Sequence, residues 1–102
     1  MTNFRTYQLA KALFHKLKVL KVKGEMKDQL ERASLSVVLN LAEGSAKSGK
    51  DRKRFFTIAM GSLKETQAII DLMEHQELLA EANIVAACLY KLIINPGPGP
   101  TA

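Results

Sequence analysis

Apolar residues recur along most of the chain at intervals of three and four positions, which is the spacing of one face of an α-helix. Between about Asn3 and Leu20 they form one stripe, made of Leu9, Leu13, Phe14, Leu17 and Leu20. The alternation of β-branched or aromatic residues with polar ones that is typical of strands is absent. Gly24, Gly44 and Gly49 separate long runs of good helix formers. The pattern therefore predicts four helices and no sheet.

The second helix, expected from about Glu25 to Glu43, carries more apolar surface than one partner can cover. Its first stripe is Met26, Leu30, Ala33, Val37 and Leu41. A second apolar patch on another side is Leu35, Val38, Leu39 and Ala42. The polar line that remains is Arg32, Ser36, Asn40 and Glu43. We expect the first stripe to face the core and the second to need another partner.

The third helix is expected to start after Ser48, whose hydroxyl could cap the backbone N–H of Asp51, and to run to about Gln76. Gly61 lies at the middle of its apolar arc. Glycine inside a helix costs about 1 kcal/mol relative to alanine. We therefore expect another backbone to approach closely at Gly61.

The fourth helix is expected to be short, from about Ala80 to Asn95, and apolar nearly all round, with Lys91 its only charge between Ile84 and Ile94. All three prolines lie in the last seven residues, where they cannot continue a helix. The chain is thus divided into a bundle over residues 1–95 and a flexible, disordered Pro/Gly tail over residues 96–102.

Connections of about four to seven residues favour an all-α, antiparallel up-down-up-down four-helix bundle. In a bundle this small every helix touches solvent, so the surplus apolar faces of the second and fourth helices would form large exposed patches. They predict a homo-oligomer. The alternative is that the fourth helix fills the core of a single copy more completely.

Charge is distributed unevenly along the 102 residues, whose formal net charge is +5. Residues 1–54 hold 13 Lys and Arg against 5 Asp and Glu, whereas residues 55–102 hold 2 against 5. A basic half is typical of proteins that bind RNA, DNA or another polyanion, and equally of a solvated basic surface. A lone cysteine, no apolar leader and no apolar stretch of membrane-spanning length favour a cytoplasmic location without a membrane partner.

Few residues are candidates for chemistry. The sequence holds no Glu-x-x-His pair, and His15 and His75 have no second metal ligand at useful spacing. Cys88 lies on the apolar fourth helix with no base beside it, as expected of a small buried apolar residue. We expect no metal, no cofactor and no enzymatic activity.

The basic turn between the second and third helices is the strongest candidate site. Its five cations are Lys47, Lys50, Arg52, Lys53 and Arg54. Gly44 can end the second helix, and the third opens with free backbone N–H groups that suit a phosphate. Two interpretations stay open: contact with an RNA backbone, or a solvated loop. In the second, Arg54 pairs with Glu43, and such a pair would fix the register of the two helices.

Four segments together resemble the bacterial four-helix-bundle family encoded by intervening sequences of 23S ribosomal RNA genes. They are Gln29-Leu-Glu-Arg-Ala33, Asn40-Leu-Ala-Glu-Gly44, Arg54-Phe55 and Gly61-Ser-Leu-Lys-Glu65. The similarity spans roughly residues 3–74, with Leu41 where isoleucine is usual and Val38-Leu39 in place of the common Pro-Ser.

This resemblance implies a left-handed antiparallel bundle, a ring-like homo-oligomer with five copies as the expected count, and an RNA-associated role. It implies a structural role for Arg32, Asn40, Glu43, Gly44 and Gly61. Related bundles are accessory proteins of reverse transcriptases. We therefore expect a nucleic-acid-binding oligomer, with a protein–protein adaptor or reverse-transcriptase accessory protein as the alternative.

Overall fold

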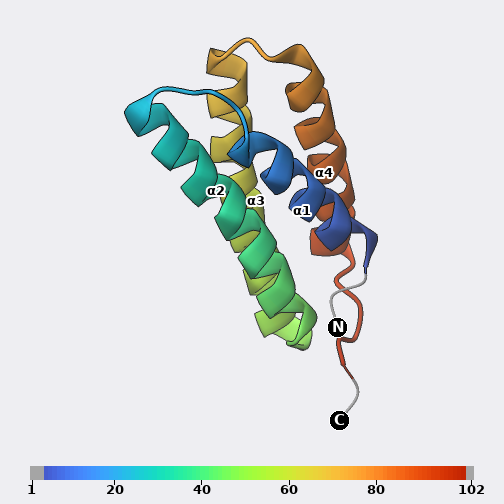
Figure 1. Ribbon diagram of the computed structural model, residues 1–102. Helices are drawn as coiled ribbons and strands as arrows, with labels where there is room; N and C mark the ends of the chain where they lie inside the picture. The colour runs from blue at the N-terminus through green and yellow to red at the C-terminus, as the bar shows by residue number, and fades with distance from the viewer. Residues whose placement is uncertain (1–3, 101–102) are drawn as a thin grey trace.

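The computed structural model describes residues 4–100, and these residues confirm the all-α prediction. Four helices follow one another: α1 (Arg5–Lys18), α2 (Gly24–Ser45), α3 (Gly49–Leu72) and α4 (Gln76–Ile94). Each helix contacts its neighbour in sequence, and α1 also contacts α4, whereas α2 and α4 do not touch within the described residues. The order around the bundle is that of an up-down bundle about 45 Å long and 20 Å wide (Figure 1).

The fourth helix is longer than predicted. It has 19 residues and begins at Gln76, while α3 ends at Leu72 instead of continuing to about Gln76. The turn between them is made by Glu74, which adopts φ 56°, and by His75, whose Nδ1 accepts the Leu78 N–H at 3.3 Å. No glycine, proline or serine occurs in this turn. The sequence therefore carries no signal for the end of α3 or the start of α4.

The core is built from every helix. Its largest fully buried side chains include Leu17 of α1, Leu30 and Leu41 of α2, Phe56 of α3 and Leu89 of α4. The first apolar stripe of α2 therefore faces the core as predicted, apart from a half-exposed Met26 near the start of the helix.

The second apolar patch of α2 is divided between core and solvent. Val38 is 8% exposed and belongs to the core, whereas Leu35 and Leu39 are 41% and 56% exposed. Val38 directly follows the core residue Val37 and belongs to the core cluster. The two leucines lie outside this cluster and remain an unpartnered apolar surface of the chain.

Of the two glycines in the middle or last turns of α2 and α3, Gly44 and not Gly61 is the one that another group approaches closely. A Cβ on Gly44 would lie 2.6 Å and 2.8 Å from two ring carbons of Phe56. A Cβ on Gly61 would meet no atom within 4 Å, because this residue lies on the exposed face of α3. The expectation of a close backbone at Gly61 is thus wrong for the single chain.

Two smaller expectations about helix ends have different outcomes. Ser48 is the N-cap residue of α3, but its side chain makes no capping hydrogen bond. Helix α4 ends at Ile94 with Asn95 as its C-cap residue, close to its expected end, and Arg52 Nε donates to the Pro96 carbonyl at 2.6 Å just beyond it. The disorder expected for residues 96–102 stays a prediction, and residues 101–102 lie outside the described range. The expected first residue of the first helix, Asn3, lies outside it too, and α1 begins at Arg5.

Candidate nucleic-acid interface

The basic turn lies at the end of the bundle where α4 also ends (Figure 1). The last turn of α2 tightens there, since the N–H groups of Ala46 and Lys47 donate to the Glu43 and Gly44 carbonyls, both at 3.1 Å. Gly49 then adopts φ 57°, a left-handed conformation that glycine tolerates without strain. These two features reverse the chain within three residues, Ala46 to Ser48, and start α3 beside the end of α2.

Arg52 points into the turn. Its Nη1 donates to the Ser45 carbonyl at 3.0 Å and lies 3.4 Å from the Gly44 carbonyl oxygen. Its Nε donates to Pro96, and its guanidinium carbon lies 5.2 Å from the centre of the Phe56 ring. The guanidinium therefore lies at the negative end of the α2 dipole and donates to carbonyls of the last turn of α2.

Sequence reasoning missed this role and grouped Arg52 with the phosphate-binding cations. The only hint was energetic, because a cation in the first turn of a helix is unfavourable for that helix. Here Arg52 stabilises the end of α2 rather than the start of α3.

The other cations of the turn face solvent to different degrees. Lys50 and Lys53 are exposed and have no ion pair within residues 4–100. The Arg54 guanidinium carbon lies 4.6 Å from the centre of the Phe55 ring, and its Nε lies 3.8 Å from Asp51 Oδ1. Lys47 pairs with Glu43 at 3.3 Å. Lys50, Lys53 and Arg54 are the exposed cations of the turn, whereas Lys47 and Arg52 are half-buried; we name these three exposed residues the turn cations.

The predicted pair between Glu43 and Arg54 is wrong. Each residue has a partner on its own helix or at its own helix end, Lys47 for Glu43 and Asp51 for Arg54. Both side chains are at least half exposed, so neither charge is desolvated enough to need the other.

A small polar network joins the middle of α2 to the middle of α3. The hydroxyls of Ser36 and Ser62 lie 2.7 Å apart, and Asn40 Nδ2 donates to the Ser36 carbonyl at 2.8 Å and to its hydroxyl at 3.1 Å. Of the residues expected to be structural, Asn40 and the buried Gly44 contribute to helix packing, whereas Arg32, Glu43 and Gly61 are exposed.

A second set of cations lies at the opposite end of the bundle. Lys18, Lys21 and Lys23 are exposed around the α1–α2 connection, and Lys27 donates to the Lys18 and Leu20 carbonyls at 2.9 Å and 3.0 Å. The basic first half of the chain is therefore split between two ends of a 45 Å rod. Counting charges along the sequence could not reveal this split.

The histidines and the cysteine have ordinary surroundings. His15 is exposed beside Phe14, His75 caps α4, and Cys88 is half-buried. No three His, Cys, Asp or Glu residues among the described positions gather closely enough to hold a metal ion. Within residues 4–100, no helix is both long and apolar enough to cross a membrane.

Comparison with known proteins identifies the family. The family model of the 23S rRNA-intervening sequence protein matches residues 3–91, and its description names no catalytic activity. No curated protein and no solved structure matches the chain. The matched range covers all of α1, α2 and α3 and most of α4. The chain belongs to the 23S rRNA-intervening sequence protein family.

Proposed function

We propose that the protein is a non-enzymatic, basic homo-oligomer that binds the phosphate backbone of structured RNA through the turn cations. The observation that carries this proposal is the local arrangement of charge. Three solvent-facing cations surround the N-terminus of α3, where backbone N–H groups are free, while Arg52 is held by carbonyls. We leave Arg52 out of the binding surface for that reason.

Exposed apolar residues support the oligomer. Leu35 and Leu39 on α2 and Ile84, Tyr90 and Ile94 on α4 are each at least 41% exposed. A family member is expected to form a ring, with five copies as the count. A closed ring relates its copies by rotation alone, so every basic turn would lie on the same circle. Several weak phosphate contacts on one RNA then raise its apparent affinity.

The experiment is a salt-dependent titration of structured ribosomal RNA fragments against two triple variants. Changing Lys50, Lys53 and Arg54 to alanine should weaken binding and reduce the slope of log K against log salt by about 2 to 3, since each lost contact contributes about 0.7 to 0.9. The matched control changes Lys18, Lys21 and Lys23 to alanine, which removes the same charge from the other end.

A larger loss of RNA affinity in the turn-cation variant than in the control variant locates the interface at the α2–α3 turn. Equal losses from both variants would mean that net charge alone drives binding, and an unchanged slope in the first variant would contradict the proposal. A duplex DNA of equal length distinguishes RNA binding from general binding to nucleic acids.

The alternative is a protein–protein adaptor, including a reverse-transcriptase accessory protein, and it is favoured by the same exposed apolar residues. A pull-down with and without nuclease separates the two functions. Partners that remain after nuclease treatment support the adaptor, whereas loss of all partners supports nucleic-acid binding.

A further inference from the structure

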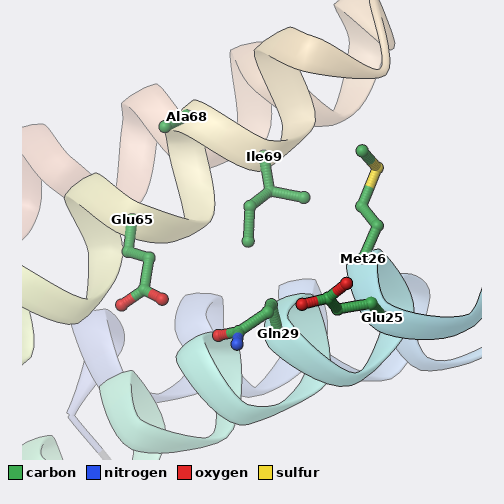
Figure 2. A pocket seen from close by; sticks show the side chains of 6 residues that line it. All are labelled: Glu25, Met26, Gln29, Glu65, Ala68 and Ile69. Atoms are coloured by element: carbon green, nitrogen blue, oxygen red, sulfur yellow. The ribbon is translucent and has the colours of Figure 1, made fainter.

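A mostly apolar groove lies between α2 and α3. Its volume is about 390 Å³, and it is lined by Glu25, Met26, Gln29, Glu65, Ala68 and Ile69. Figure 2 shows the Ile69 side chain pointing into the space between the helices and the Glu65 carboxylate at its edge. The groove therefore combines an apolar floor with an acidic rim.

The charges of this rim have no internal partner. Glu25 and Glu65 take part in no ion pair among the described residues, and no cation lines the groove. An occupant that fits must supply apolar side chains and a positive charge at one place.

The outer face of α4 has that composition. Ile84 and Ile94 are 50% and 62% exposed, and Ala87 and Lys91 are exposed between them at helical spacing. Lys91 is the only charge of this stretch and makes no ion pair among residues 4–100. The face is thus the chemical complement of the groove.

The two surfaces cannot meet within one copy. Helix α4 contacts α1 and α3 but not α2 in the described structure, so its outer face and the α2–α3 groove point in different directions. When each copy presents one patch to one neighbour and the other patch to a second neighbour, the contact is heterologous and builds a ring or an open chain.

We propose that the α4 face of one copy docks into the α2–α3 groove of the next, with Lys91 pairing with the acidic rim at Glu65. This proposal rests on the proposed homo-oligomer and names the surfaces that form it. Ile84 and Ile94 cover the apolar floor, while the lysine neutralises a carboxylate that the contact takes out of water. Because the contact removes this ion pair from water, the pair also sets the register of the two copies.

The test reverses each charge alone and then exchanges the two charges in one double variant. Sedimentation velocity across a range of protein concentrations measures the oligomeric state of each variant. Lys91→Glu and Glu65→Lys should each raise the concentration of half-dissociation by at least about tenfold, because like charges would face each other. The double variant in one chain should return it toward the wild-type value. Lys64→Glu is the control, since Lys64 is exposed beside Glu65 on α3 and lies outside the groove. Far-UV circular dichroism checks that each variant keeps its helices.

The outcomes distinguish failure of the proposed homo-oligomer from failure of this interface alone. A wild-type protein that stays monomeric overturns the proposed oligomer and this interface together. A wild-type oligomer that both reversals leave intact, or that the swap does not restore, overturns this interface alone. Dissociation by Lys64→Glu to the same extent would also overturn it, because the effect would then be one of net charge.

Discussion

Gly44 and Phe56 illustrate how one pair of residues determines the distance between α2 and α3. Phe56 is fully buried, and two of its ring carbons lie where a Cβ on residue 44 would be. The ring cannot withdraw, because it is surrounded by core side chains. The absence of a side chain at residue 44 is therefore a packing requirement.

Gly44→Ala should lower the free energy of unfolding by about 1 to 3 kcal/mol, since overpacking outweighs the gain in helix propensity. Gly61→Ala is the matched control, because its Cβ would meet open space and should stabilise the helix by up to about 1 kcal/mol. Urea denaturation of both variants measures the difference. A destabilised Gly61→Ala protein would mean that another copy approaches this face of α3.

At the scale of elements, the C-terminal carbonyls of two helices accept hydrogen bonds from a cation of the next helix. Arg52 of α3 holds carbonyls at the end of α2, and Lys27 of α2 holds the last carbonyls of α1 and its following turn. A cation at a helix C-terminus satisfies orphan carbonyls and interacts favourably with the dipole. The connections are thereby stabilised by long side chains rather than by turn residues.

Arg52→Ala should lower the free energy of unfolding by about 1 to 3 kcal/mol, because it removes the donor to the Ser45 and Pro96 carbonyls. Arg52→Lys should recover part of this loss, since an ammonium keeps the charge but not the forked geometry. The control is Lys53→Ala, whose exposed side chain should contribute less than about 0.5 kcal/mol. Equal midpoints of urea unfolding for Arg52→Ala and Lys53→Ala would show that the guanidinium contacts do not stabilise the fold.

At the scale of the whole molecule, the tail and the basic turn meet. The Pro96 carbonyl accepts from Arg52, so the chain beyond α4 lies against the α2–α3 turn. This contact links the last segment of the chain to the proposed RNA-binding end.

Removing residues 96–102 should destabilise the protein by less than Arg52→Ala does, because Arg52 keeps its contacts with the end of α2. The expected loss is below about 1 kcal/mol, the contribution of one hydrogen bond. Thermal unfolding of the truncated chain beside Arg52→Ala compares the two. A larger loss from truncation would make the tail, and not the α2 carbonyls, the principal partner of Arg52.

The sequence by itself determined the helix count, the up-down order and the core stripe of α2, because apolar spacing records which face of a helix leaves water. Short connections between helices then permit few arrangements. It also located the basic turn and suggested the family, since both depend on contiguous residues.

Only the tertiary structure decided which long side chain reaches which partner. Arg52 turned inward, Glu43 and Arg54 took separate partners, and the basic half of the chain divided between two ends. A long charged side chain has many rotamers of similar energy, and the carbonyls or carboxylates nearby select among them. Those neighbours come from other helices, so periodicity along one helix carries no information about them.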